Sequence, residues 1–301
     1  MKNWKFVFWV FLFCGVALGS QAKKKKTRVI MIALDGISVE GFQKAATPNL
    51  DILLKEGALS LTTRVVMPSV TLPNWTSHLT GSSPEQHGVV NNAWQLEKFV
   101  LPAVETDADG YYPSVFTVLK EQVPGIKTAF YYNWINLFYP YNKRYFDEVS
   151  YLENDAYVPN YKKAFDFVVK NCQSPTLVFL YSVHTDHAGH KHSWMSLEYI
   201  RSVEEADREI GRFLGKLKAE GLYEDTYFMF LSDHGGIHYG HGGVTTDEMI
   251  VPWGITGPGI KKGMEITEPN NTVNTAAMIV HLFGKKKPLS WTGEIIESVF
   301  K

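Results

Sequence analysis

Several strand-like runs of this sequence end in side chains that can bind metal ions or attack an electrophile. The residues that follow these runs are Asp35, Thr71, Asp186 with His190, and Asp233 with His234. Seven of the ten histidines lie in or beside these segments, which is more clustering than chance placement gives. Mixed carboxylate and imidazole ligands suit Zn²⁺ better than Mg²⁺ or Mn²⁺. The pattern predicts a metal centre.

Thr71 lies between a β-like run at 61–66 and a segment at 73–79 that is typical of the first turns of a helix. Pro73 fits the first helical turn because its fixed backbone angle suits a helix start. The N-terminus of a helix offers free N–H groups and partial positive charge, which favour an alkoxide or a phosphoryl oxygen. Thr71 is therefore a candidate nucleophile, and the alternative is a helix N-cap without chemistry.

The elements that must position these residues alternate along the chain. Strand-like runs cover 27–34, 128–132, 176–183 and 226–231, and helix-like segments cover 50–56, 113–122, 161–170 and about 195–220. This alternation predicts an α/β fold with a mostly parallel central sheet sandwiched by helices. Because ligands bind beyond the carboxyl ends of such strands, the polar residues above are expected to share one edge of the sheet.

Length and composition allow one large domain or two small ones, and we expect a single catalytic domain over residues 23–301. The chain has 301 residues, of which 45% are hydrophobic, so it can bury a substantial core. Two aromatic-rich segments, around 93–112 and 133–159, fit the alternation poorly. We interpret them as loops over the mouth of the site, with local packing as the alternative. The formal net charge of −1 argues against wrapping of nucleic acid.

The first 22 residues have the pattern of a signal peptide. Lys2 and Lys5 precede an apolar run at 6–18, and small residues up to Ala22 suit a signal peptidase. This predicts a secreted or periplasmic protein with no stable membrane span after cleavage, and an uncleaved anchor is the alternative. Cleavage leaves Cys172 as the single cysteine, so no internal disulfide is expected.

The motifs also occur in a recognisable order. They are Asp35-Gly36, Thr71-Leu72-Pro73-Asn74, Thr80-Gly81, His87-Gly88, Asn92, Asp186 with His190, Ser232-Asp233-His234-Gly235 and His241-Gly242. Through them the chain resembles the alkaline phosphatase superfamily and, within it, the type I phosphodiesterase/nucleotide pyrophosphatase family. The resemblance spans residues 29 to about 260 and implies an alkaline phosphatase-like fold.

The resemblance also implies roles for individual residues. It implies two zinc sites, one made by Asp35, Thr71, Asp233 and His234 and the other by Asp186, His190 and His241. Thr71 would attack phosphorus, and Asn92 would help to hold a non-bridging phosphoryl oxygen. The implied substrate is a small phosphodiester or pyrophosphate, with a nucleotide among the candidates.

One departure from the family concerns the last histidine. His241 lies only seven positions after His234, whereas the nucleotide pyrophosphatases place this ligand after a long insertion. His238 therefore competes with His241 as the third ligand. We favour His241, because the apolar run that follows it resembles the closing strand of the superfamily. His184, His187 and His192 are expected outside the ligand sets.

The residues around Thr71 narrow the reaction class. They lack the Cys/Ser-x-Pro-x-Arg motif of sulfatases, and residues 68–96 contain no Arg or Lys. A phosphomonoester dianion usually needs a guanidinium partner, so a diester is favoured unless Lys143, Arg144 or Lys191 reaches the site. The alternatives are a phosphomonoesterase or phosphonate hydrolase on the same site and a non-catalytic, metal-stabilised binding protein. Three aromatic residues have two alternative roles, stacking on a base or sugar of the substrate or packing in the core: Trp75, Tyr131 and Trp134.

Overall fold

The structure is a computed structural model, and it describes residue 1 and residues 26–301. The predicted signal peptide, including Lys2, Lys5 and its apolar run, therefore lies outside the described residues apart from Met1. Among the described residues, no helix has both the length and the apolar character that a membrane span requires.

One sheet of eight strands forms the centre of the molecule, in the order β4-β3-β5-β1-β6-β7-β2-β8. Neighbouring strands are parallel except where β7 pairs with β6 and with β2. The strands are β1 (Arg28–Leu34), β2 (Gly57–Arg64), β3 (Lys127–Tyr132), β4 (Glu148–Tyr151), β5 (Thr176–Ser182), β6 (Thr226–Leu231), β7 (Ile250–Thr256) and β8 (Met264–Glu265). The prediction of a mostly parallel α/β sheet is confirmed.

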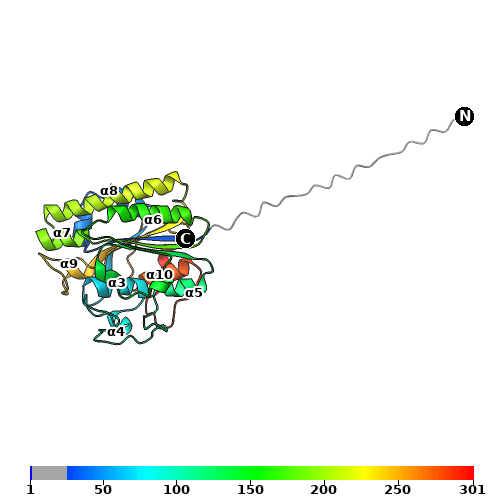
Figure 1. The fold of residues 1–301 in the computed structure, drawn as a ribbon. Coiled ribbons are helices and arrows are strands. Elements are labelled where there is room, and N and C mark those ends of the chain that lie inside the picture. The colour runs from blue at the N-terminus through cyan, green and yellow to red at the C-terminus, as the bar shows by residue number, and fades with distance from the viewer. Residues whose placement is uncertain (2–25) are drawn as a thin grey trace.

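Helices cover both faces of this sheet (Figure 1). One face carries α1 (Val39–Lys44), α2 (Pro48–Lys55), α6 (Val158–Lys170), α7 (His184–His192) and α8 (Leu197–Ala219). The other carries α3 (Thr71–Thr80), α4 (Pro84–His87), α5 (Val115–Gln122) and α10 (Asn274–Leu282), while α9 (Thr246–Met249) precedes β7. Because both faces are covered, β1 and β5 are buried along their whole length, which explains their continuous apolar runs.

The helix signals of the sequence match the structure closely in the longest element. Ser196 caps α8 by accepting a hydrogen bond from the Tyr199 N–H, as a serine N-cap does. Glu220 follows the helix, and Gly221 then takes a positive φ of 66°, which a glycine tolerates without steric cost. The predicted end of this helix at about residue 220 is confirmed.

Two elements differ from the sequence prediction. Strand β2 begins at Gly57 rather than at residue 61, because its first residues pair with β7 and β8. The segment 133–159, expected as loops, also contains β4 and the short 3₁₀ helices η1 (Ile135–Phe138) and η2 (Lys143–Tyr145). Strand β4 gave no periodic signal because it has only four residues, mostly half-buried, at the sheet edge beside β3.

Candidate active site

The carboxyl ends of three adjacent parallel strands bring the predicted residues together. Strand β1 lies between β5 and β6, and the Asp35 N–H donates to the Ser182 carbonyl at 3.0 Å. Asp35 follows β1, Asp186 lies in α7 directly after β5, and Asp233 with His234 follows β6. The expectation that these residues share one sheet edge is therefore met.

Asp35, Asp233 and His234 form a fully buried cluster, named here the inner group. Their potential ligand atoms all lie within 4.8 Å of one another. His234 Nε2 is 3.4 Å from Asp35 Oδ1 and 3.2 Å from Asp233 Oδ2, and all three side chains have zero exposure. Two carboxylates and an imidazole at this spacing could hold one divalent cation.

Neighbouring residues leave one oxygen of each inner carboxylate free. Asp35 Oδ2 accepts hydrogen bonds from Trp75 Nε1 at 3.2 Å and from the Tyr181 hydroxyl at 2.5 Å. Asp233 Oδ1 accepts from the Gly36 N–H at 3.1 Å. The opposite oxygens, Asp35 Oδ1 and Asp233 Oδ2, are buried and have no hydrogen-bond donor among the described residues. Because an unpaired buried carboxylate oxygen is costly, the cluster fits a bound cation.

Asp186, His190 and His241 form a second cluster, named here the outer group. Asp186 and His190 lie four residues apart on α7, and Asp186 Oδ1 is 3.5 Å from His190 Nε2 and 3.6 Å from His241 Nε2. This buried oxygen, Asp186 Oδ1, also lacks a donor within residues 26–301. The His190 side chain is 43% exposed, against 8% for Asp186. The outer group therefore opens to solvent, unlike the inner group.

All three histidines of the two groups have the same tautomer. The Nδ1 atoms donate to backbone carbonyls: His234 to Gly235 at 2.8 Å, His190 to Tyr239 at 2.9 Å and His241 to Ser69 at 3.0 Å. A carbonyl can only accept, so Nδ1 carries the proton and each Nε2 presents a lone pair to a carboxylate. This arrangement is typical of histidines that bind a metal ion through Nε2.

In both groups, burial shifts pKa values in the direction that favours the neutral form of the side chain. It raises the pKa of Asp35 and of Asp233 well above the usual range, and the neighbouring carboxylates raise both further. Burial also raises the pKa of Asp186 to about 7 and lowers that of His241 to about 4. Three carboxylates concentrated in a nonpolar environment need positive charge, which a divalent cation in each group would supply.

The two groups touch through their histidines. The His234 and His241 rings stack with centroids 3.6 Å apart and planes 16° from parallel. Gly36 takes a positive φ of 70°, and a Cβ at this position would come within 3.1 Å of Asp186 Oδ1. Glycine is therefore needed there, because it lets the end of β1 approach the outer group.

Thr71 lies beside the inner group, at the first residue of α3. Its Oγ1 is 3.3 Å from His234 Nε2, and the residue is only 5% exposed. Val70 occupies the N-cap position, so the alternative that Thr71 is merely an N-cap is wrong. The hydroxyl instead projects at the helix N-terminus, where partial positive charge favours a negative oxygen.

Asn92 is brought next to Thr71 by a long-range hydrogen bond. Its Oδ1 accepts from the Leu72 N–H at 2.7 Å, and its backbone carbonyl accepts from Asn136 Nδ2 at 3.0 Å. The first bond fixes the orientation of the amide against the start of α3. The Leu72 N–H is thereby occupied, and the Asn92 amide group is held beside the start of α3, where Thr71 lies.

Other histidines of the sequence motifs lie outside both groups in the described structure. His238, the competitor of His241, is exposed with a positive φ of 53°. His184 stacks on Tyr157 with ring centroids 3.9 Å apart, and His187 Nδ1 pairs with Asp155 at 2.6 Å. The geometry thus brings His241 to Asp186 and leaves His238 aside.

Two of the three aromatic residues considered for stacking are core residues, and the third, Trp134, is half-buried and packs against the core. Trp75 is fully buried and donates to Asp35, while Tyr131 lies on the opposite face of the sheet and donates to Glu148 Oε1 at 2.9 Å. A different aromatic cavity, of about 540 Å³, lies between the two aromatic-rich segments, and its walls include Gln95, Tyr111, Phe138, Tyr139 and Lys143. Arg144, a candidate for substrate charge, instead pairs with Asp109 at 2.7 Å.

The sequence analysis missed three residues of this site and the contact of a fourth, Trp75, which it considered only for stacking or packing. Tyr181 and Trp75 donate to Asp35 Oδ2, and the Thr185 hydroxyl donates to the Asp35 carbonyl at 2.6 Å. Trp194 donates to the Gly36 carbonyl at 2.9 Å. They come from β5, α3, α7 and the segment before α8, and no spacing pattern in the chain relates them to Asp35.

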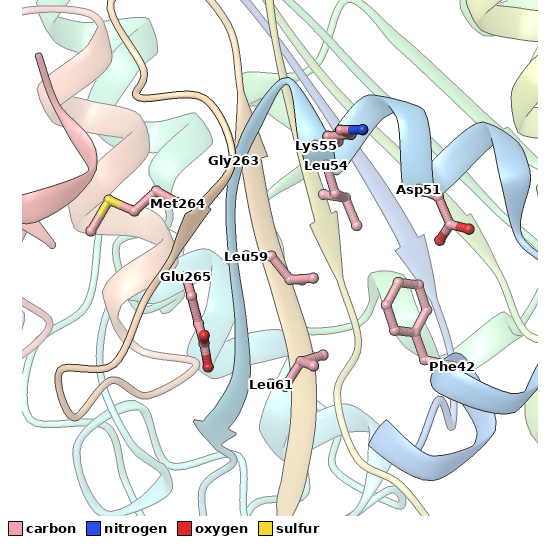
Figure 2. A pocket seen from close by; sticks show the side chains of 9 residues that line it. All are labelled: Phe42, Asp51, Leu54, Lys55, Leu59, Leu61, Gly263, Met264 and Glu265. Carbon is pink, nitrogen blue, oxygen red and sulfur yellow. The ribbon is translucent and has the colours of Figure 1, made fainter.

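A further cavity lies between α2 and the strands β2 and β8. Its volume is about 410 Å³, and the side chains of Phe42, Leu54, Leu59 and Leu61 face one another in it (Figure 2). Asp51, Lys55 and Glu265 also line it. No residue of the inner or outer group contributes to its lining, so it is separate from the candidate active site.

Comparison with protein families shows to which family the chain belongs. Residues 29–282 match the family model described as type I phosphodiesterase / nucleotide pyrophosphatase. The chain belongs to this family. The prediction from the motif order is confirmed, and the members of this family are phosphoric ester hydrolases.

Curated relatives in the family are distant and longer. The ectonucleotide pyrophosphatase/phosphodiesterase family member 3 of Rattus norvegicus is 27% identical over 220 residues, which cover 69% of this chain and 24% of the relative. The bis(5'-adenosyl)-triphosphatase ENPP4 of Bos taurus is 26% identical over 242 residues, which cover 75% of this chain and 52% of the relative. The chain thus spans about a quarter to a half of the length of these two relatives.

Among solved structures, the chain is similar to murine ectonucleotide pyrophosphatase / phosphodiesterase 5, which was solved as an inactive threonine-to-alanine variant in complex with AMP. The TM-score is 0.76 at 14% identity, and the match covers 92% of this chain and 100% of that chain. This likeness establishes that the chain has the fold of the family.

Proposed function

We propose that this protein is a metal-dependent phosphodiesterase or nucleotide pyrophosphatase-like hydrolase that uses Thr71 as its nucleophile. The observation that carries the proposal is the placement of the Thr71 hydroxyl against two contiguous ligand groups. Thr71 Oγ1 lies 3.3 Å from His234, and His234 stacks on His241 of the outer group. A nucleophile at such a position can be ionised and oriented by bound cations.

The ligand sets fit two zinc ions, one held by the inner group with Thr71 and one by the outer group. Donorless buried oxygens and Nε2 lone pairs support this assignment in both groups. Imidazole ligands favour Zn²⁺ over Mg²⁺ or Mn²⁺. When bound, the two ions would act as Lewis acids on the attacking and leaving oxygens.

The protein residues of the site have different roles in the proposed reaction. Thr71 Oγ1 attacks phosphorus in line, the bond to the leaving oxygen breaks, and water later hydrolyses the phosphothreonine. Asn92, whose Oδ1 is held by the Leu72 N–H, directs its amide donor at a non-bridging oxygen. Trp75 and Tyr181 hold Asp35 through its Oδ2, which leaves Oδ1 for the cation.

A small phosphodiester or pyrophosphate is the proposed substrate class, with nucleotides as candidates. The AMP complex of murine phosphodiesterase 5 and the name of the bovine triphosphatase support a nucleotide. Residues 68–96 supply no cation for the extra charge of a monoester, and Arg144 is engaged by Asp109. A diester monoanion needs less positive charge than a monoester dianion.

The proposed location is secreted or periplasmic. The signal-peptide pattern of residues 1–22 supports export, as does the prefix "ecto" in the name of the rat relative. A chain with one cysteine after cleavage would need no disulfide to fold in an oxidising compartment.

The test compares hydrolysis of bis(p-nitrophenyl) phosphate and p-nitrophenyl phosphate by the zinc-loaded protein. We expect faster hydrolysis of the diester, and loss of activity in Thr71→Ala and on chelation. Thr76→Ala is the matched control, because Thr76 lies on the same helix with its hydroxyl bonded to the Leu72 carbonyl.

The outcomes separate the competing functions. Preference for the monoester would support the phosphomonoesterase alternative, and hydrolysis of a phosphonate ester alone would support the phosphonate hydrolase. Metal binding without hydrolysis of either would indicate a non-catalytic binding protein. Full activity in Thr71→Ala would overturn the proposed nucleophile.

A further inference from the structure

Trp194 lies between the two chain segments that carry the outer histidines. It is 4% exposed and belongs to the turn between α7 and α8. Its ring centroid is 5.2 Å from that of His190 at an interplanar angle of 85°, and 5.9 Å from that of His241 at 70°. Edge-to-face packing of this kind restricts the tilt of each imidazole ring.

Two hydrogen bonds anchor Trp194 to the rest of the site. Its Nε1 donates to the Gly36 carbonyl at 2.9 Å, next to Asp35 of the inner group. Its backbone N–H donates to the His238 carbonyl at 2.7 Å, in the segment that leads to His241. The indole is therefore tied both to the end of β1 and to the loop after β6.

Two glycines make room for the indole. A Cβ at Gly189 would lie 2.7 Å from indole atoms, and a Cβ at Gly236 would lie 2.2 Å from them. Gly189 precedes His190 on α7, and Gly236 follows the inner residue His234. Both segments therefore contact the indole closely beside the histidines that they carry.

We propose that Trp194 is the positioning residue of the outer group. Its indole fixes the orientations of His190 and His241, so that both Nε2 atoms face Asp186 Oδ1. The inference rests on the proposed function, since it assigns the outer group to a divalent cation. Asp35 of the inner group has its own anchors in Trp75 and Tyr181, so Trp194 acts mainly on one of the two groups.

The test measures zinc affinity at each group in Trp194→Phe and Trp194→Ala. Zinc is removed from the purified protein and returned in a titration against a chromogenic chelator, and bound zinc is counted by mass spectrometry. Trp291→Phe is the matched control: Trp291 is 2% exposed and donates Nε1 to the Pro113 carbonyl at 3.2 Å, away from both groups.

The outer group has one carboxylate and an exposed histidine, so we expect it to hold the weaker-binding ion. That ion should lose affinity about tenfold in Trp194→Phe and about 100-fold in Trp194→Ala, the range for residues that orient metal ligands. The tighter ion should keep its wild-type affinity in both variants, and Trp291→Phe should keep both ions. If Trp194 had a purely structural role, its replacement would lower the affinity for both ions together, or it would lower only the melting temperature.

The inference would be overturned if Trp194→Phe bound each ion as tightly as the wild type does. It would also be overturned if the variant lost affinity for both ions to the same extent. If Trp194→Ala fails to fold, Trp194→Phe decides alone. A wild-type protein that takes up fewer than two zinc ions would contradict the metal centre and the inference together. A wild type that binds two ions but hydrolyses no phosphodiester would contradict the proposed function alone.

Discussion

The inner and outer groups use the same kinds of side chain in opposite surroundings. The inner group has two carboxylates and one histidine with zero exposure, in the segments that follow β1 and β6. The outer group has one carboxylate and two histidines, on α7 and a loop, and His190 is 43% exposed. Because their surroundings differ, we expect these two adjacent ligand sets to differ in how firmly they hold a cation.

Charge reinforces this difference. Two carboxylates without competing water attract a dication more strongly than one carboxylate at a solvent-open site. Thr71 lies at the inner group, so the nucleophile would share the more firmly bound ion. The outer group, open to solvent, would serve the leaving oxygen and the hydrolytic water.

The largest effect is expected from Thr71→Ala at the inner group. Removal of a covalent nucleophile lowers kcat by on the order of 10⁴-fold or more. Steady-state hydrolysis of the chromogenic diester measures this loss, and zinc counting checks that the inner ion stays bound. A loss of less than tenfold would contradict a covalent role for Thr71.

Asn92→Ala should have the next largest effect, because it removes one donor to the transition-state charge. Loss of such a donor lowers kcat by about 10²-fold. Zinc content should stay unchanged, since Asn92 contacts the Leu72 N–H rather than either group. An effect on KM alone, with kcat intact, would place Asn92 in ground-state binding instead.

The exposure difference between the groups should appear as two rates of zinc release. We expect a chelator to remove the outer ion at least about tenfold faster than the inner ion, by analogy with the effect of solvent access on metal sites. Stopped-flow absorbance of the chelator complex measures both phases. His190→Gln should remove the fast phase, and a single rate in wild type would break the comparison.

The smallest effect concerns pH in the metal-free protein. Burial raises the pKa of Asp186 from 3.8 to about 7. The folded state therefore binds this proton more tightly than the unfolded state, so the stability that the neutral carboxyl contributes is present below pH 3.8 and is lost as pH rises through about 7. The melting temperature of Asp186→Asn should therefore rise relative to that of the wild type as pH increases from 4 to 8.

Calorimetry of the chelated proteins checks this prediction. The difference in melting temperature between Asp186→Asn and wild type should grow with pH and stay small at pH 4. A difference that is constant across this range would show that Asp186 ionises normally in the folded protein.

The fold and the strand-end residues were predictable because their signals are local. Continuous apolar runs marked β1 and β6, and Asp35 and Asp233 follow them directly. Strand β4 was missed because its pairing with β3 comes from a segment 19 residues away in sequence and not from its own four residues. Helix α3 begins at Thr71, two residues before the proline that suggested it.

The surroundings of the site were not predictable for the same physical reason. Asp35 accepts hydrogen bonds from Trp75 and Tyr181, which lie 40 and 146 residues from it in the sequence. These side chains meet Asp35 only in the folded protein. Trp194 reaches Gly36 across 158 residues. Such contacts depend on strand order and side-chain packing, which one sequence does not encode in any periodic pattern.

Anomalous diffraction at the zinc edge from crystals of the zinc-loaded protein tests the central claim most directly. The account predicts two peaks, one bonded at about 2.0–2.2 Å to Asp35, Asp233 and His234 and the other to Asp186, His190 and His241. The Thr71 hydroxyl should ligate the first ion. A single peak, or peaks away from these residues, would contradict the two-metal site.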